Sequence, residues 1–209
     1  MIIEDSFDQG TIEWLVARLG RPTASCFGSI VTSTGKKATG QSGYINQLVA
    51  ERVLEEPLDG FQSLEMFQGK ANEGESRATY QLLTGSEVTE VALIYPDEDQ
   101  LVAASPDGLI QGAGGWVGGL ELKNVQAKAQ VEYIRGGVVP TKYKPQVYGS
   151  LYISGLEYWD FMSCSIGFKP LLVRTHLYDK GYCAYAAKLD EYLPPFLEAL
   201  DEAEKLVRE

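Results

Sequence analysis

The sequence predicts a single α/β domain that spans residues 1–209. Three observations lead to this prediction. Segments with helical spacing come first, strand-like apolar runs with helical patterns among them follow, and an amphipathic helical segment closes the chain. This order is typical of a sheet covered by helices. A length of 209 residues is enough for one sizeable core, and no repeat, long linker or low-complexity tract divides the chain.

Helical periodicity and end signals mark the first part of the chain. In the first predicted helix, apolar residues recur at helical spacing and Gly20 suits the C-terminal end. Thr23 is a suitable N-cap for the second helix. A run rich in Gly, Ser and Thr then predicts a loop. The predicted helices cover residues 11–20, 24–31, 44–56 and 65–83, and the loop covers residues 32–43.

Strand-like apolar runs follow, and helical patterns return among them. Pro145 is tolerated only near the start of a helix, so the helix that contains it is expected to begin close by. The predicted strands cover residues 87–95, 100–105, 116–125, 158–165 and 170–178. The predicted helices of this part cover residues 129–136, 144–155 and about 182 to the end.

The charge distribution keeps nucleic acid open as a partner. A net charge of −11 at pH 7 argues at first sight against phosphate binding, which usually shows as a basic excess. However, residues 14–50 contain no acid, and between residues 122 and 156 the only acid is Glu132, against several lysines and arginines. A locally positive cleft on an acidic body is therefore consistent with the sequence.

Compartment signals favour the cytoplasm. Cys26, Cys164 and Cys183 are odd in number and far apart, which predicts neither a disulfide framework nor a CxxC metal site. The acidic start "MIIEDSFDQG" does not resemble a secretion signal, and no apolar run approaches the length of a membrane span. We therefore expect a cytoplasmic protein without a membrane partner.

Asp107, Glu121 and Lys123 form the pattern with the clearest chemical meaning. Side chains alternate along a strand, so Glu121 and Lys123 point to one face while Leu120 and Leu122 point to the other. A glycine-rich, hairpin-like connection can return Glu121 beside Asp107. Two carboxylates that meet there repel each other unless a cation lies between them. The pattern therefore suggests a Mg²⁺ site, in which Lys123 stabilises charge that develops at a phosphate.

Glu73, on the predicted helix over residues 65–83, is a further carboxylate candidate, and Arg77 follows one turn later. A purely structural interpretation stays open for the whole pattern. Asp-Gly after Pro is a common turn, and Glu-x-Lys on a strand is often a solvent-exposed pair. Short patterns of this kind also produce many false matches.

A wider set of motifs resembles the PD-(D/E)XK nuclease superfamily. Its core is "SPDGL" followed by "GLELK". Further stretches in matching order narrow the resemblance to the YqaJ-like viral recombinases, the family typified by phage lambda exonuclease. The stretches cover most of residues 10–165 and read "EWLVARLGRPTAS", "QGKANEGESRATYQLLTGSEVTE", "SPDGL", "GLELK" and "KPQVYGSLYISGLEYWDF". The resemblance implies a restriction-endonuclease-like fold, in which helices flank a central mixed sheet.

The resemblance also implies roles for residues at the centre of the site. Two Mg²⁺ ions are expected, with Mn²⁺ as a substitute. Glu73 matches a helix-borne glutamate that helps to hold a metal or its water, and Gln146 matches a glutamine close to the reactive phosphate. The residues implied in catalysis are Lys123, Glu73 and Gln146, and those implied in metal binding are Asp107, Glu121 and the backbone carbonyl of Leu122.

A second group matches residues of the family that bind the 5′-terminal phosphate. Arg18 and Ser25 lie at matching positions, and Ser105 adds a hydroxyl. Ser25 would lie in the first turn of a helix, where free N–H groups favour an anion, and an arginine can bind the same phosphate in bidentate fashion. Without the resemblance, Arg18 would read as a surface arginine and Ser25 as an ordinary helix-start residue.

Three residues are weaker candidates for DNA contact. In the family an apolar side chain near Met66 wedges between the bases of the duplex, although this chain has Gln68 where the relative carries an aromatic residue. Packing of Met66 in the core is the alternative. Lys36 and Lys37 can contact the DNA backbone or form a solvated pair.

The resemblance implies a Mg²⁺-dependent exonuclease that degrades the 5′-ended strand of linear double-stranded DNA to mononucleotides and leaves a 3′ overhang. It further implies a homotrimeric ring, a single-strand annealing protein as partner, and a phage or prophage origin in a bacterial host. Two alternatives stay open. One is another PD-(D/E)XK nuclease, such as an endonuclease or repair nuclease. The other is a non-catalytic scaffold that binds DNA ends in recombination.

Overall fold

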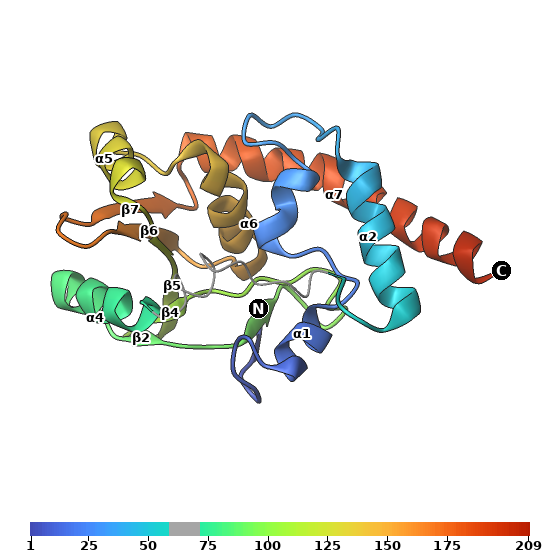
Figure 1. Ribbon diagram of the computed structural model, residues 1–209, viewed down its shortest axis with the longest axis horizontal. Coiled ribbons are helices and arrows are strands. Elements are labelled where there is room, and N and C mark those ends of the chain that lie inside the picture. Colours follow the sequence, from blue (N-terminus) through green and yellow to red (C-terminus); the bar gives the residue numbers. More distant parts are fainter. Residues whose placement is uncertain (59–71) are drawn as a thin grey trace.

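The computed structural model describes residues 1–58 and 72–209. A five-stranded sheet in the order β2-β4-β5-β6-β7, flanked by helices, lies toward one side of the molecule (Figure 1). β5 and β6 run parallel, whereas the other neighbouring strands are antiparallel. The strands are β2 (Val88–Thr89), β4 (Gly108–Gly112), β5 (Gly115–Asn124), β6 (Tyr158–Cys164) and β7 (Leu171–His176). The predicted α/β class with a central mixed sheet is confirmed.

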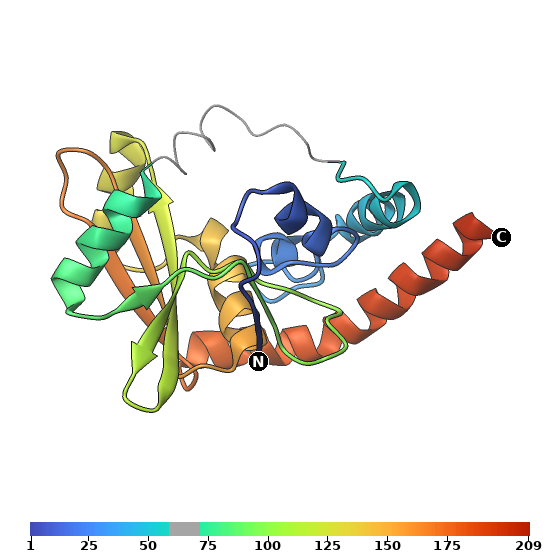
Figure 2. The same ribbon diagram turned by 90° about the horizontal axis from the view of Figure 1, so that it is seen from below.

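Helices cover both faces of this sheet, because successive strand residues point to opposite sides. Tyr80 of α4 packs with Leu120 and other apolar residues on one face. On the other face, the core contains Trp159 and Phe161 of β6 together with residues of α6. Figure 2 shows α4 and α6 on opposite sides of the sheet. The helices of this part are α4 (Glu73–Thr84), α5 (Ala127–Gly136), α6 (Lys144–Ser154) and α7 (Lys180–Arg208).

Of the N-terminal elements, η1 packs mainly on α6 and α2 packs mainly on α7. Phe27 belongs to the same buried cluster as residues of α6 and α7, and the rings of Tyr44 and Phe196 lie 5.7 Å apart between α2 and α7. A separate antiparallel pair joins the N-terminus to the segment before β4. These elements are β1 (Ile2–Glu4), α1 (Ile12–Arg18), the 3₁₀ helix η1 (Ala24–Ser29), the 3₁₀ helix η2 (Thr141–Tyr143) before α6, α2 (Gln41–Leu54) and β3 (Leu93–Tyr95).

Two of the predicted strands differ in the structure. The run over residues 87–95 divides into β2 and β3, which belong to different sheets. It divides because the N–H of Ala92 turns away to the carbonyl of Glu4 in the N-terminal strand. Residues 100–105 form only isolated bridges, since Ala103 hydrogen-bonds to the loop around Pro22 and Ala24 and Ala104 pairs with Ile94.

The second predicted helix also differs, since residues 24–29 form the 3₁₀ helix η1 rather than an α-helix. Thr23 stands at its N-cap position, but its side chain makes no capping hydrogen bond. The short strand β1 was not predicted. Across residues 1–58 and 72–209, no helix is long and apolar enough to cross a membrane.

Candidate active site

The β4–β5 hairpin brings Asp107 against the strand that carries Glu121. The N–H of Asp107 donates to the carbonyl of Leu120 at 3.0 Å, and Asp107 Oδ2 accepts a 2.6 Å hydrogen bond from the N–H of Leu122. Gly108, which pairs with Leu120, allows the close approach of β2, because a Cβ at this position would lie 2.2 Å from Val88 Cγ1. The expected return of Glu121 beside Asp107 is observed.

Glu121 and Lys123 extend from β5 toward the same side of the sheet, as their alternation predicts. They form an ion pair in which Glu121 is almost completely buried, at 1% exposure. Glu121 Oε2 has no hydrogen-bond partner within the part of the chain that the structure describes. The Lys123 Nζ also lies 5.7 Å from the centre of the Tyr143 ring. Glu121 is therefore buried at the sheet and Lys123 is partly buried, so the two do not form the solvent-exposed pair of the structural interpretation.

The electrostatics of this site are unfavourable for several negative charges. Burial raises the pKa of Glu121 to about 8, with Lys123 opposing this shift and the Asp107 and Glu73 carboxylates adding to it. Burial also raises the pKa of Asp107, while Lys123 again opposes the shift. Burial by itself lowers the pKa of Lys123, but the two carboxylates outweigh it and hold the ammonium in its charged form. The positive charge of Lys123 therefore does not fully compensate the negative charge of the carboxylates at this site.

The first turns of α4 bring two more charged residues to Asp107. Glu73 is close enough to influence the titration of Glu121, and it lines a cavity of about 290 Å³ together with Arg77 and Asp107. Arg77 Nε donates to the backbone carbonyl of Asp107 at 3.0 Å, and its Nη1 pairs with Glu90. The sequence placed Glu73 and Arg77 on one helix face, but it gave no signal that Arg77 contacts the backbone of the metal-site candidate.

The donor set fits a hard divalent cation. Asp107 and Glu121 supply carboxylate oxygens, one of which is buried without a hydrogen bond. No group of three or more His, Cys, Asp or Glu side chains within residues 1–58 and 72–209 is arranged to hold a metal ion. This is compatible with Mg²⁺, which usually takes one or two protein carboxylates and completes its shell with water and phosphate oxygens. The ligand role of the Leu122 carbonyl stays a prediction.

Gln146 lies half-buried in the first turn of α6, three residues after Tyr143. Residues at this spacing share a helix face. Because the Tyr143 ring lies next to Lys123 Nζ, the start of α6 borders the acidic site. The structure shows no hydrogen bond from Gln146 to the acids, so its role close to a phosphate stays a prediction. Pro145 lies at the beginning of α6, as expected.

Arg18 and Ser105, two of the phosphate-binding candidates, are joined directly in the structure. Arg18 Nη1 donates to Ser105 Oγ at 2.6 Å, and the guanidinium stacks 4.3 Å from the centre of the Trp14 ring. Trp14 Nε1 lies 3.2 Å from the same hydroxyl. Ser105 precedes Asp107 by two residues, so this arginine is tied to the segment that carries a metal-ligand candidate.

Thr23 links the third candidate to this group. Its hydroxyl lies 3.5 Å from Arg18 Nη2 and 3.0 Å from the hydroxyl of Ser25. The side chain that was expected to cap a helix therefore connects Arg18 to Ser25 instead. We call Arg18, Thr23, Ser25 and Ser105 the hydroxyl–arginine cluster. The sequence identified three of its four members and missed the role of Thr23.

Arg18 carries a charge that no carboxylate pairs with directly among the described residues. Burial lowers the pKa of the guanidinium, and more distant groups such as Glu51 only partly oppose this shift. A half-buried arginine surrounded by hydroxyl groups can accept an anion, since charge-assisted hydrogen bonds to phosphate are strong. The cluster is chemically suited to a terminal phosphate.

Comparison with known proteins agrees with the motifs. Residues 13–157, more than half of the chain, match the model of the YqaJ-like viral recombinase domain. The chain belongs to the YqaJ family. A search of curated proteins finds no significant match.

Solved structures of similar fold include an alkaline exonuclease. LHK-Exo from Laribacter hongkongensis is 25% identical with a TM-score of 0.77, and the match covers 95% of this chain and 98% of that one. LHK-Exo in complex with dAMP is similar at a TM-score of 0.76, also with 25% identity and coverage of 95% and 98%. A phage-related exonuclease from Haemophilus somnus 129PT, 10% identical with a TM-score of 0.56, covers 90% of this chain and 95% of its own, and it supports the fold alone.

The remaining DNA-binding candidates of this YqaJ-family protein are Lys36, Lys37 and Met66, and their contact with DNA stays a prediction. Lys36 and Lys37 are exposed on the loop before α2. At Gly35 this loop lies next to Lys188 of α7, and Lys37 forms a bridge with Val31. Within the described parts of the chain, neither lysine forms an ion pair with the acids. Met66 lies outside the described residues.

Proposed function

We propose that this YqaJ-family protein is a Mg²⁺-dependent exonuclease that acts on linear double-stranded DNA. It degrades the 5′-ended strand to mononucleotides and leaves a 3′ overhang. The observation that carries the proposal is the link between two sites: Ser105, bonded to Arg18, lies two residues before Asp107 on one chain segment. A phosphate held at Arg18 would therefore be kept at a constant distance from the acidic site, as cleavage from a strand end requires.

The relatives support the same activity. The structure that resembles this chain at a TM-score of 0.77 is that of an alkaline exonuclease. A second structure of LHK-Exo contains dAMP, a nucleoside monophosphate of the kind that such cleavage releases. Residues 1–209 would then act as one exonuclease domain.

Each group has a role in the proposed reaction. When bound by Asp107 and Glu121, Mg²⁺ would supply the Lewis acid that activates water and stabilises charge at phosphorus. Lys123, in the same buried site, would place its ammonium against the scissile phosphate and stabilise the charge that develops there. Glu73 would orient the attacking water, and Gln146 would hold a phosphate oxygen. Arg18 and its hydroxyl neighbours would hold the terminal phosphate.

A direct test compares three DNA substrates with Mg²⁺: linear duplex with 5′-phosphate ends, the same duplex with 5′-hydroxyl ends, and a closed circle. We expect mononucleotides from the linear substrates alone, faster from 5′-phosphate ends, and none with Lys123→Ala. Cutting of the circle would support another PD-(D/E)XK nuclease that shares these acids. End binding without nucleotide release would support the scaffold.

A substitution of Arg18 tests the preference for 5′-phosphate ends. Arg18→Ala should lower the rate on 5′-phosphate ends by roughly 10- to 100-fold, the loss expected for hydrogen bonds to a charged group, and leave 5′-hydroxyl ends nearly unaffected. Arg135→Ala, which removes an exposed arginine from α5, is the matched control. An equal loss on both kinds of ends would contradict a terminal-phosphate site at Arg18.

We further propose that the enzyme works as a homotrimeric ring and delivers its overhang to a single-strand annealing protein. Sedimentation equilibrium should then give about three times the monomer mass of 23.0 kDa. A monomeric or dimeric mass would reject the ring without affecting the chemistry of the acidic site.

A further inference from the structure

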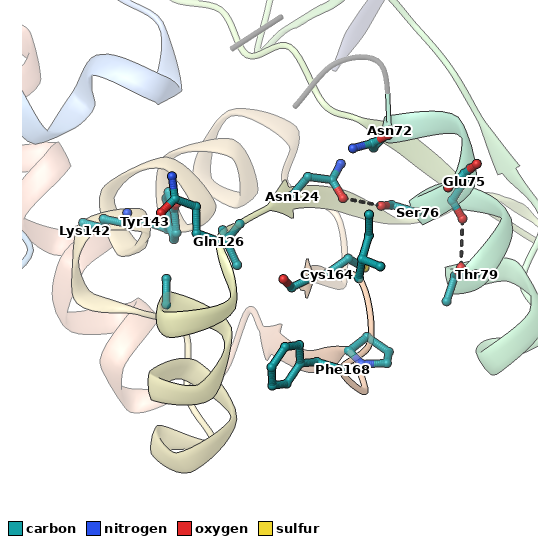
Figure 3. Close-up of a pocket in the computed structure, with 15 residues that line it drawn as sticks. Asn72, Glu75, Ser76, Thr79, Asn124, Gln126, Lys142, Tyr143, Cys164 and Phe168 are labelled. Carbon is teal, nitrogen blue, oxygen red and sulfur yellow. Dashed lines mark hydrogen bonds between the residues drawn. The ribbon is translucent and has the colours of Figure 1, made fainter. Parts of the chain in front are cut away.

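A large cleft opens where the parallel strands β5 and β6 end, next to the acidic site. It has a volume of about 740 Å³, within the range of roughly 300–1,000 Å³ common for ligand pockets. Figure 3 shows it between the start of α4, the start of α5 and the loop that follows β6. We call it the outer cleft.

The walls of the outer cleft combine aromatic, aliphatic and neutral polar groups. Tyr143 and Phe168 supply aromatic rings, and the neighbouring loop residue Ile166 is 94% exposed, as an unpartnered apolar side chain. On the α4 side, Ser76 Oγ donates to Asn124 Oδ1 at 2.8 Å. These groups suit a flat ligand with apolar faces and polar edges, which describes a nucleobase.

The charge of the outer cleft differs from that of the whole chain. Among the described residues that line it, Glu75 is the single carboxylate, although the chain carries a net charge of −11. Lys142 lies at its edge, with Nζ 4.6 Å from the centre of the Tyr143 ring and 5.8 Å from that of Tyr133. An exposed ammonium beside aromatic rings is suited to the phosphate backbone that accompanies stacked bases.

The position of the outer cleft relative to the acids decides which part of a strand would reach it. Asn124 lines the cleft and directly follows Lys123 on β5, and Tyr143 contacts both the cleft and Lys123 Nζ. Ser105, which is bonded to Arg18, precedes Asp107 and β4, whereas Asn124 of the outer cleft follows Lys123 at the end of β5. Along these paired segments of the chain, the acids therefore lie between the two groups.

We propose that the outer cleft binds the unpaired bases on the 3′ side of the scissile phosphate, in the strand that is being degraded. The inference rests on the proposed exonuclease function. With the terminal phosphate at Arg18 and the scissile phosphate at the acids, the next nucleotides extend past Lys123 toward Tyr143 and Phe168. Stacking there keeps the second and third nucleotides separated from the complementary strand before cleavage.

The test places 2-aminopurine, whose fluorescence is quenched by stacking, at the second or third nucleotide of the 5′-ended strand. Binding is followed with Ca²⁺ in place of Mg²⁺, and turnover with Mg²⁺. Phe168→Ala should abolish the quenching and raise KM for DNA on the order of ten-fold, as loss of one stacking platform predicts, with kcat nearly unchanged. Phe168→Tyr should behave like the wild type, and Lys142→Gln should raise KM less.

Tyr178→Ala is the matched control, because it removes a 75% exposed aromatic side chain just after β7, at the other end of that strand from Phe168. Active enzyme in which Phe168→Ala leaves both quenching and KM unchanged would overturn the proposal. If the wild type releases no nucleotide, the proposed exonuclease function fails. The quenching of 2-aminopurine then tests separately whether the outer cleft binds bases. Quenching lost in Phe168→Ala alone supports base binding, whereas wild type without quenching rejects it.

Discussion

At the scale of single residues, the acidic site keeps charges where packing alone would exclude them. Glu121 is buried in the sheet with one oxygen unpaired, and its neighbours Asp107 and Glu73 make its ionisation harder. Replacing such groups by apolar residues often stabilises a protein, so their presence indicates chemistry rather than folding. Arg77 helps to fix the position of Asp107, because it donates a hydrogen bond to the backbone carbonyl of Asp107 rather than to its carboxylate.

Arg77→Ala should weaken the response of the enzyme to Mg²⁺. Outer partners of metal ligands typically contribute roughly 10- to 100-fold to metal affinity or activity, and we expect the Mg²⁺ concentration for half-maximal rate to rise within that range. Titration of the initial rate with Mg²⁺ measures the effect. Glu90→Gln is the matched control, because Glu90 is 71% exposed and its ion pair among the described residues is with Nη1 of Arg77. Equal effects of both substitutions would mean that the ion pair, and not the bond to Asp107, matters.

At the scale of elements, helices set the positions of residues that the strands do not carry. α4 is tied to the sheet by Tyr80, whose hydroxyl donates to the buried carboxylate of Asp160 at 2.5 Å. Arg174 binds the same carboxylate through two 2.8 Å hydrogen bonds from β7. This network joins one helix and two strands, and it fixes the helix whose first turns present Glu73 and Arg77 to the site.

The packing of η1 on α6 should control the recognition of strand ends. A Cβ at Gly149 would lie 2.5 Å from Phe27 Cδ2, so in Gly149→Ala the buried Phe27 ring must shift, and we expect it to move η1, the element that carries Ser25. Overpacking of this kind costs about 1–3 kcal/mol of stability. We expect the preference for 5′-phosphate over 5′-hydroxyl ends to fall while the rate on 5′-hydroxyl ends stays close to that of the wild type.

Gly43→Ala in α2 provides the control for Gly149→Ala, because nothing lies within 4 Å of a Cβ at Gly43. Urea unfolding should show lower stability for Gly149→Ala alone. If the Gly149→Ala protein is destabilised but keeps the full preference for 5′-phosphate ends, the packing of η1 does not control end recognition.

The same elements show what the sequence can and cannot predict. Alternation on β5 was sufficient to place Glu121 and Lys123 on one face, because strand geometry is local. The helix with Glu73 was likewise predictable from its pattern over the described residues, whereas residues 65–71 of that predicted helix lie outside them. The hydrogen bonds of Thr23 and the non-strand course of residues 100–105 were not, since both depend on partners distant in the sequence, such as Arg18 and Ile94. Met66 lies outside the described residues, so its predicted role is not compared with the structure.

At the scale of the whole molecule, the C-terminal helix connects the fold to the hydroxyl–arginine cluster. Arg52 of α2 pairs with Asp201 and Glu204 of α7 at 3.0 and 2.9 Å, and its Nε donates to the carbonyl of Gly20 at 2.7 Å. Gly20 follows Arg18 by two residues, so α7 supports the loop beyond α1 through a single arginine. Two acidic residues of α7 thus form ion pairs within the molecule, and they also contribute to the net charge of −11.

The stability of the chain should depend on Mg²⁺ bound at the proposed metal site. A Mg²⁺ ion held by Asp107 and Glu121 would relieve the repulsion among the buried carboxylates, and binding to the folded state alone would add about 2.7 kcal/mol at 100 times the Kd. For a chain of this length, each kcal/mol corresponds to a rise in Tm of roughly 2–4 °C. We therefore expect saturating Mg²⁺ to raise the Tm by roughly 5–10 °C in a thermal melt without DNA.

Asp107→Asn, which preserves the shape and a hydrogen-bond acceptor for Leu122, should lose most of this shift, whereas Glu132→Gln on the exposed face of α5 should keep it. A shift of equal size in Asp107→Asn would locate the stabilising Mg²⁺ away from the acidic site, and it would do so whether or not the protein cleaves DNA.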